Sequence, residues 1–496
     1  MKYLSYLALS LALACSASPP PKAEALPQPE PASSAASLPP DPEPWRNERP
    51  PAGAPGKLQF PTPEQAQLSS GLTIALVRKP VPVTSISLVF RHGGAASPTG
   101  KSGLAALTAR MLTEGTRRHP GAKLAEEVEQ LGSVLDENVS RDTSSLSLSA
   151  LSADVGRAIE LLGEVVTEPA FAAADFERVQ REWLDGLRSE RQAPERLASL
   201  AGLRSLLGKP HGSPVSGSLV DVQKLALKDL VDFHRRAYLA GDATLIVVGD
   251  VELPAIRKSA ELAFKKLARG RAELEQPFTP PPAPPPKQIT LVDRPGAVQS
   301  ALFLAQRAPK RSEPGFESRE LLTTLFGGLF TSRLNLNLRE EHAYTYGARA
   351  QSVGTRSWGA FYISTSVRTD VTADALREAL SELAKLKDPK LGKPLEPSEI
   401  ARARADLVQS VGSRLEYAGR IGSTLAELWL HALPADYYAR YPDVLAAETP
   451  ETLARTAAAL DPSQLVIVVV GDRSVVQAPL ERLGYQVVAA APELTE

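Results

Sequence analysis

The sequence predicts an α+β protein made of two copies of one αβ unit of roughly 200 residues, joined by a proline-rich linker. The phrase Val-Val-Gly-Asp ends an apolar, β-branched run twice, at residues 247–250 and again at 469–472. The strands and helices expected before each of these endings follow the same order. Between the two series lies the run 275–287, which is dominated by proline and is expected to form an extended, semi-rigid linker.

The first copy opens with two β-branched runs that predict strands, and it closes on a third. Periodic apolar patterns predict the helices between them. The expected elements are strands at 71–77, 85–90, 143–149 and 243–250, and helices at about 101–114, 153–166, 173–192 and up to about 267.

The second copy repeats this order after the linker. Two short strands are followed by a helix, two further strands, two helices and a closing strand. The expected elements are strands at 288–292, 299–304, 344–352, 359–368 and 464–472, and helices at about 316–330, 371–385 and 397–413.

The first fifteen residues predict an export signal. Lys2 precedes an apolar run, 4–14, that is too short to span a bilayer and has the length of a signal-peptide core. The run ends in L-A-L-A-C at Cys15, the only cysteine of the chain, and this phrase resembles a bacterial lipobox. A lone thiol has no disulfide partner, so lipidation of Cys15 is favoured over ordinary signal cleavage beside an incidental cysteine. We expect an exported lipoprotein tethered to a membrane without spanning it, with Ser16 favouring the periplasmic face of the outer membrane.

Composition divides the rest of the chain and excludes one class of partner. Residues 16–56 are rich in Pro, Ala, Ser and Glu without a periodic apolar pattern, so we expect a disordered spacer. Two halves follow at 57–270 and 288–490, with the linker at 271–287. The chain carries 56 Lys and Arg against 57 Asp and Glu, which gives no reason to expect a nucleic-acid partner.

Residues 103–116 read G-L-A-A-L-T-A-R-M-L-T-E-G-T. They resemble the pitrilysin/insulinase (inverzincin) signature G-[L]-A-H-x-x-E-H-[ML]-x-x-x-G-T, which places two His and one Glu on one helix face. The phrases at 209–217 and 327–334 are also similar to that family, and the resemblance covers nearly all of residues 57–490. It implies two αβ-roll halves like those of processing peptidases. The matching positions are Gly103, Leu104, Ala105, Met111, Gly115 and Thr116.

The residues that would bind the metal differ from the family pattern. The resemblance places the two zinc-binding His at Ala106 and Arg110, and the Glu that activates the zinc-bound water at Ala109. The third ligand, a Glu on a later helix, falls at Gly186. Asp185, by a register slip of one residue, and Glu182 are the nearest carboxylates.

Arg110 also places a permanent positive charge near the position of a dication. At an effective dielectric constant near 20, that repulsion is on the order of several kcal/mol. None of the six His stands at metal-ligand spacing to another, and His92, expected near the cleft, is typical of a loop histidine. We therefore expect this chain to hold no catalytic zinc.

A second motif is kept. Residues 338–347, L-R-E-E-H-A-Y-T-Y-G, resemble the family's L-R-E-x-x-x-A-Y-S, so Arg339 and Tyr344 fall on the Arg and Tyr that the family uses against its substrate. We expect Arg339 to end a helix and Tyr344 to begin a strand on the same face, where both could stabilise the oxyanion of an attacked peptide. The alternative is that Arg339 caps carbonyls or pairs with Glu340, and that Tyr344 packs in the core.

Two functions follow from this resemblance. In the first, the chain is the non-zinc subunit of a heteromeric zinc peptidase. It would bind an extended peptide and supply Arg339 and Tyr344 to a homologous partner that carries H-x-x-E-H and the zinc. In the second, it is a stand-alone pseudopeptidase lipoprotein that binds peptides or acts as a scaffold in the cell envelope.

Overall fold

The computed structural model describes Glu43, residues 59–274 and residues 276–495, and its compact unit extends from Leu58 to Glu496. Cys15, the expected signal peptide and nearly all of the expected spacer lie outside the described residues. In the described part of the chain, no helix is both long and apolar enough to traverse a bilayer.

The first half is a six-stranded sheet in the order β1-β2-β6-β3-β5-β4. The pairs are antiparallel except β2 with β6, which run parallel. Its strands are β1 (Glu64–Gln67), β2 (Thr73–Arg78), β3 (Val83–Phe90), β4 (Asp136–Val139), β5 (Ser144–Leu151) and β6 (Ala243–Gly249). Its helices are α1 (Leu104–Leu112), α2 (Ala122–Glu129), α3 (Val155–Thr167), α4 (Ala173–Glu190), α5 (Pro194–Leu207), α6 (Leu219–Lys224), α7 (Leu227–Ala237) and α8 (Leu253–Ala263).

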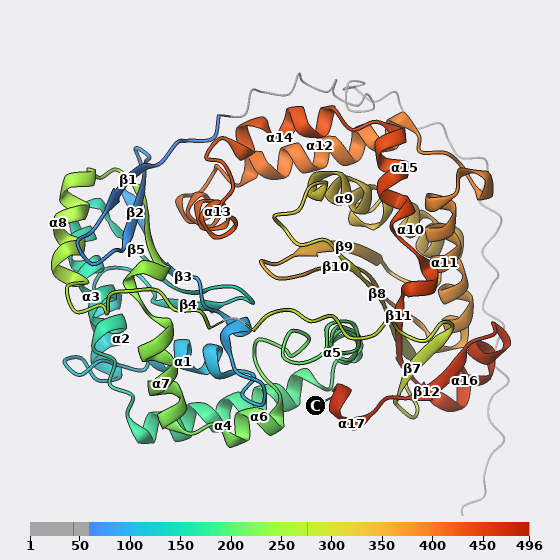
Figure 1. Cartoon of the computed structure of the whole chain (residues 1–496), viewed down its shortest axis with the longest axis horizontal. Helices are drawn as coiled ribbons and strands as arrows, with labels where there is room; N and C mark the ends of the chain where they lie inside the picture. The colour runs from blue at the N-terminus through green and yellow to red at the C-terminus, as the bar shows by residue number, and fades with distance from the viewer. Residues whose placement is uncertain (1–42, 44–58, 275, 496) are drawn as a thin grey trace, which may run out of the picture. The chain divides into compact units, whose positions relative to one another are not determined.

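The second half repeats the sheet in the order β12-β7-β11-β8-β10-β9 (Figure 1). It differs at one edge, where β12 pairs parallel with β7 while β1 pairs antiparallel with β2. Its strands are β7 (Gln288–Asp293), β8 (Gln299–Ala308), β9 (Ala348–Gly354), β10 (Gly359–Arg368), β11 (Val466–Gly471) and β12 (Gln486–Ala489). Its α-helices are α9 (Phe316–Thr323), α10 (Arg333–Asn335), α11 (Thr372–Lys387), α12 (Pro397–Ser413), α13 (Ala418–His431), α14 (Tyr437–Ala446), α15 (Pro450–Ala458), α16 (Arg473–Arg482) and α17 (Pro492–Thr495). Two π-helical turns, η5 (Thr324–Gly328) and η6 (Leu336–Glu341), flank α10.

The two halves exchange a helix. Helix α5 of the first half packs on β8, β10 and β11 of the second, while α13 of the second half packs on β3 and β6 of the first. Each central strand therefore packs on the core of its own half with one face and on a helix of the other half with the opposite face. This explains why all residues of β6 and β11 are buried and why both read as continuous apolar runs.

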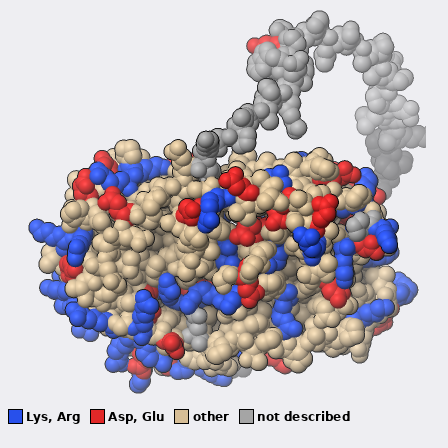
Figure 2. Space-filling view, turned by 45° about the horizontal axis from the view of Figure 1, so that its top comes forward, with Lys and Arg blue, Asp and Glu red and all other residues tan. Residues whose placement is uncertain are grey.

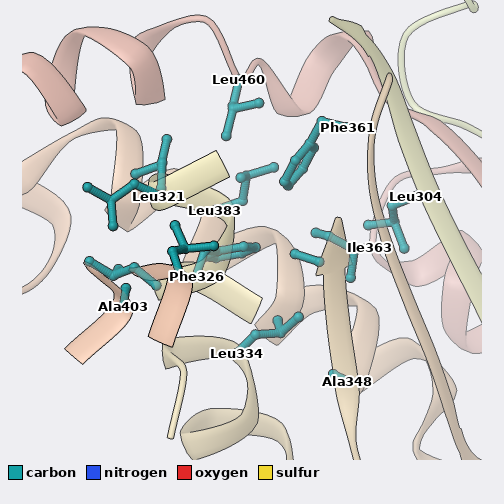
Figure 3. Packing of buried hydrophobic residues seen from close by; sticks show 14 of the residues in the cluster. Leu304, Leu321, Phe326, Leu334, Ala348, Phe361, Ile363, Leu383, Ala403 and Leu460 are labelled. Atoms are coloured by element: carbon teal, nitrogen blue, oxygen red, sulfur yellow. The ribbon is translucent and has the colours of Figure 1, made fainter. Parts of the chain in front are cut away.

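The second-half core fills the space between its sheet and its helices (Figure 3). Phe326 of η5 and Phe361 of β10 pack with ring centroids 6.3 Å apart. Leu383 of α11 belongs to the same fully buried cluster. At the surface, the face in Figure 2 carries Lys and Arg together with Asp and Glu, as the near-equal totals predict.

The expected two-half α+β fold is confirmed. The strands β1, β4 and β12 and the helix α5 were not expected, and three expected segments differ from their predicted form. The helix expected to 330 is α9 followed by the π-helical turn η5 and ends at Gly328. The strand expected from 344 begins only at Ala348. The described residues of 271–287 have no regular secondary structure, and this linker lies against the folded halves because Arg307 donates to the carbonyl of Pro281 at 2.7 Å.

Candidate functional site

Helix α1 carries the first three positions of the expected metal site. Its apolar residues pack it against α7, β4 and β5. Ala109 is fully buried, whereas Ala106 is buried at the wall of a cavity. Two methyl groups therefore stand where a zinc ligand and a general base would be needed, and neither can bind a cation or move a proton.

Arg110 forms part of an ion-pair cluster. Its guanidinium lies 2.7 Å from Glu114 and 3.9 Å from Glu137, and it donates to Thr113 Oγ1 at 2.8 Å. Glu114 also accepts from Arg178 of α4. Burial raises the pKa of Glu137 in spite of the nearby Arg110. The positive charge of Arg110 is thus balanced by protein carboxylates, and it stays one turn from Ala106.

Helix α4 brings no carboxylate to the cavity at the third-ligand position. Gly186 is exposed, and a Cβ added there would meet only open space. Asp185 pairs with Arg188 and has a side chain 73% exposed, so the one-residue register slip does not turn a carboxylate inward. Glu182 is likewise exposed and pairs with Arg178 at 3.2 Å.

The inward residue at this level of α4 is Trp183, which the sequence reasoning missed. Its indole Nε1 donates to the carbonyl of Ser216 at 2.8 Å, and its side chain lines the cavity opposite Ala106. Val179 and Phe176, one and two turns earlier, are buried on the same face. Their i, i+3, i+7 spacing was the available signal that Trp183, and not Asp185, faces inward.

The cavity at the degenerate metal site measures ≈ 460 Å³. Its walls come from α1, α4, α5, the edge strand β4 and the loop around residues 212–216. The lining combines Trp183 and aliphatic side chains with charged ones, among them Arg141, which follows β4. A cleft of this volume and lining is typical of a small-ligand or peptide site.

The residues present do not fit a zinc ion. Among the residues that the structure describes, no three His, Cys, Asp or Glu side chains gather closely enough to hold a metal. His92, expected as a loop histidine, does lie in a loop, but it is buried with its Nε2 3.1 Å from Asp242. Burial lowers the pKa of His92, which makes it a structural hydrogen-bonding group.

Arg339 lies in the π-helical turn η6, on the opposite half of the chain. Its side chain is 31% exposed and its guanidinium sits 3.9 Å from the centre of the Phe330 ring. Glu340 is 3.5 Å away and largely exposed, so that pairing is weak. Single π-helical turns inside helices are frequent at functional sites because they displace one residue outward.

Tyr344 was expected to begin a strand, but it lies in the turn before β9. Ala343 adopts a left-handed conformation (φ 52°), and the amide of Tyr344 donates back to the carbonyl of Leu338 at 2.9 Å. This reversal folds Tyr344 onto the helix end, where its ring stacks on His342 with centroids 5.0 Å apart and partly covers the core. Tyr346 is 91% exposed.

The fold has two αβ-roll halves, and the ligand positions on α1 and α4 carry no metal-binding side chain. These features define a peptidase-like protein without the metal ligands of a peptidase. The model of "Insulinase (Peptidase family M16)" matches residues 73–204, and the model of "Peptidase M16 inactive domain" matches residues 224–407. The chain belongs to the M16 (insulinase) peptidase family.

Individual relatives agree with this assignment. The chain is 25% identical over 299 residues to "Non-peptidase homolog YmxG" of Helicobacter pylori, across 60% of this chain and 68% of that protein. It is 23% identical over 417 residues to an "Uncharacterized zinc protease" of Rickettsia bellii, across 81% of this chain and 98% of the relative. The crystal structure of a peptidase M16 inactive domain from Pseudomonas fluorescens matches with a TM-score of 0.75 at 25% identity, covering 83% of this chain and 98% of that one. These likenesses fit a catalytically incomplete member of the family.

Proposed function

We propose that this chain is the non-zinc subunit of a two-chain M16 peptidase. Its partner would be a homologous chain with an intact H-x-x-E-H helix, and zinc bound there would activate the attacking water. This chain would bind the extended peptide substrate and present Arg339 and Tyr344 to it. The observation that carries the proposal is the contrast between the two motifs: the metal positions are methyl groups or open space, whereas Arg339 remains an accessible cation.

The surroundings of Arg339 support a role in binding. Phe330, whose ring contacts the guanidinium, is 64% exposed, and Leu336, three residues before Arg339, is 45% exposed. Large apolar side chains exposed beside a weakly paired cation are typical of a binding surface, because a partner that covers them buries apolar area and makes the site around the cation less polar. A guanidinium held by an aromatic face keeps its N–H groups available for a carbonyl oxygen.

Tyr344 would act from the same turn. The hydroxyl of Tyr344 has no hydrogen-bond partner among the described residues, and its ring stacks on His342 with centroids 5.0 Å apart. A fixed ring with an available hydroxyl is suited to donate to the oxygen on which negative charge develops. Both groups would therefore contribute in the transition state more than in ground-state binding.

The chain would act at a membrane surface. The export signal, the lipidation of Cys15 and the spacer 16–56 would hold the folded part near the periplasmic face of the outer membrane. The peptide would be taken up by the cavity beside α1 or by pairing with the free edge of β4, which has a neighbour on one side only in the described sheet.

A stand-alone pseudopeptidase that binds peptides or acts as a scaffold is the second candidate. The open cavity of ≈ 460 Å³ favours it, because a cleft without metal ligands can still hold a peptide. The two candidates differ in one observable, which is catalysis in the presence of the zinc-binding homologue.

Reconstitution separates them. The full chain is mixed with the zinc-binding homologue of the same genome, and kcat/KM is measured on an unstructured fluorogenic peptide. We expect zinc-dependent cleavage well above that of the homologue alone. Arg339→Ala should lower kcat by about 100-fold or more, because one oxyanion donor is lost, and Tyr344→Phe should lower it in the same direction.

Arg377→Ala is the matched control. Arg377 is an exposed Arg of α11 that pairs with Asp374 at 2.7 Å, so its loss should leave kcat unchanged. Co-purification of the two chains is measured in parallel to separate assembly from catalysis. If the mixture cleaves no faster than the homologue alone, the two-chain proposal fails and the stand-alone candidate remains.

A further inference from the structure

Arg141 is a half-buried cation that lines the cavity at the degenerate metal positions. One of its five N–H donors bonds to a protein acceptor, with Nη2 donating to the carbonyl of Ser213 at 2.5 Å. Its guanidinium also lies 5.9 Å from the centre of the Trp358 ring. No carboxylate of the described residues forms an ion pair with it. The neighbouring Asp142 instead accepts from the amide of Arg356 at 3.0 Å.

The other charges of the cavity have partners. Glu190 pairs with Arg196 at 3.1 Å, and Glu137 faces Arg110 at 3.9 Å. Arg141 thus has no ion pair among the described residues, although the charge of the adjacent Asp142 favours its protonated form. A half-buried guanidinium with N–H groups left to donate would bind an anion that enters the cavity. Burial lowers the pKa of Arg141 to about 10, which still leaves it protonated at neutral pH.

The rest of the wall is apolar. Leu200 and Leu203 of α5, Val215 of the loop and the indole of Trp183 line the same cavity. A ligand that satisfies both parts of the wall has a carboxylate and, directly beside it, an apolar side chain. The last residue of a peptide has this arrangement, whereas an internal Asp or Glu carries its carboxylate at the end of its own side chain.

We propose that this cavity binds the free C-terminus of an extended peptide, with Arg141 holding the terminal carboxylate and the apolar wall holding the last side chain. The inference rests on the proposed peptide-binding function and names the part of the peptide that this half recognises. It assigns the former metal site a binding role that needs no metal.

Three labelled hexapeptides test it on the full chain by fluorescence anisotropy. All alternate valine and threonine and end in leucine; one has a free carboxylate, one a C-terminal amide, and one a C-terminal amide with a single internal glutamate. The free acid should bind about 10- to 100-fold more tightly than either amide, the range expected for a hydrogen bond to a charged group. Arg141→Gln should remove this difference without preventing binding of the amides.

Two further variants keep the test independent of folding. Arg141→Lys retains the charge and should keep a reduced preference for the acid, and Arg188→Gln, on the exposed face of α4, should behave as the wild type. Thermal melting checks that each variant is folded. Three outcomes would each overturn the proposal. The acid and the amide bind equally, the glutamate peptide binds most tightly, or no peptide binds at millimolar concentration.

The outcomes remain distinct from those of the two-chain proposal. Loss of the acid preference with normal activation of the partner would leave the subunit role standing. A strong acid preference without activation would leave the C-terminus site standing on a chain that works alone.

Discussion

Gly202, in the middle of α5, is a position where the exchanged helix lies close against the second sheet. A Cβ added at Gly202 would lie 2.2 Å from Cδ1 and 2.6 Å from Cε1 of Phe303 on β8. The Phe303 ring is 2% exposed and stacks on Tyr362 with centroids 5.1 Å apart, so it has little room to retreat. Gly202→Ala therefore tests whether α5 docks on the other half as the structure has it.

The magnitude follows from two opposing effects. The ring would have to move by roughly 1 Å to restore ordinary contact, and overpacking of this kind costs about 1–3 kcal/mol. Replacing Gly by Ala inside a helix contributes about 1 kcal/mol in the stabilising direction. Gly186 supplies the control, because it is also in a helix interior but a Cβ there meets nothing within 4 Å. Gly186→Ala should raise stability by up to about 1 kcal/mol, and Gly202→Ala should fall about 1–3 kcal/mol below it.

The assay is equilibrium urea unfolding of the full chain, followed by circular dichroism, with the two variants compared at equal slope. Phe303→Leu combined with Gly202→Ala should recover part of the loss, since the smaller side chain vacates the space of the new methyl group. If Gly202→Ala stabilises the protein as much as Gly186→Ala does, α5 does not pack on Phe303 in solution and the helix exchange is wrong.

Three further results are expected. The Nε2 of His234 bonds to the carbonyl of Val166 at 2.8 Å, and burial lowers the pKa of His234 to about 4, so the imidazole stays neutral in the fold. Because the unfolded chain binds a proton there at a higher pH, stability should fall as the pH drops from about 6.5 towards 4. An NMR titration of this imidazole near pH 6.5 would contradict the prediction. Glu114→Gln should destabilise the fold by about 1–2 kcal/mol. This is the low end for a charged hydrogen-bonding partner, because Arg110 and Arg178 are more than a third exposed. A urea midpoint equal to that of the wild type would show that this ion-pair cluster does not stabilise the fold. The wild-type chain should bind no stoichiometric zinc in calorimetry, because Ala106 and Ala109 present methyl groups and Gly186 is exposed without a side chain; stoichiometric zinc bound by the unmodified chain would contradict this.

The sequence predicted the central strands because those residues are buried on both faces and read as uninterrupted apolar runs, as in β6 and β11. It missed the edge strands β1 and β4, since E-Q-A-Q and D-E-N-V have no apolar alternation and are ordered by main-chain pairing with a neighbour. Helix α5 was not predicted from the sequence, and no local pattern can say which sheet a helix covers. That choice depends on contacts between residues about one hundred positions apart, such as Gly202 with Phe303.

At the candidate site, the sequence placed the substitutions but not their surroundings. The resemblance located Ala106, Ala109 and Arg110 on one helix, and α1 carries them as expected. The turn at Tyr344 could not be foreseen, because a left-handed Ala343 is set by the packing around it and has no glycine to signal it. Arg141 follows an edge strand with no periodic pattern, so only the folded chain brings it to the cavity wall.

Ionic contacts join α1 and α4 beside the degenerate metal positions. Glu114, just beyond the end of α1, accepts from Arg110 of that helix and from Arg178 of α4, and Arg178 reaches Glu182 as well. The carboxylate of Glu114 is only 12% exposed, so these contacts are screened less than surface pairs. Under the proposed function, this ionic link would hold the two helices together without a metal and would leave the cavity beside them open to a ligand.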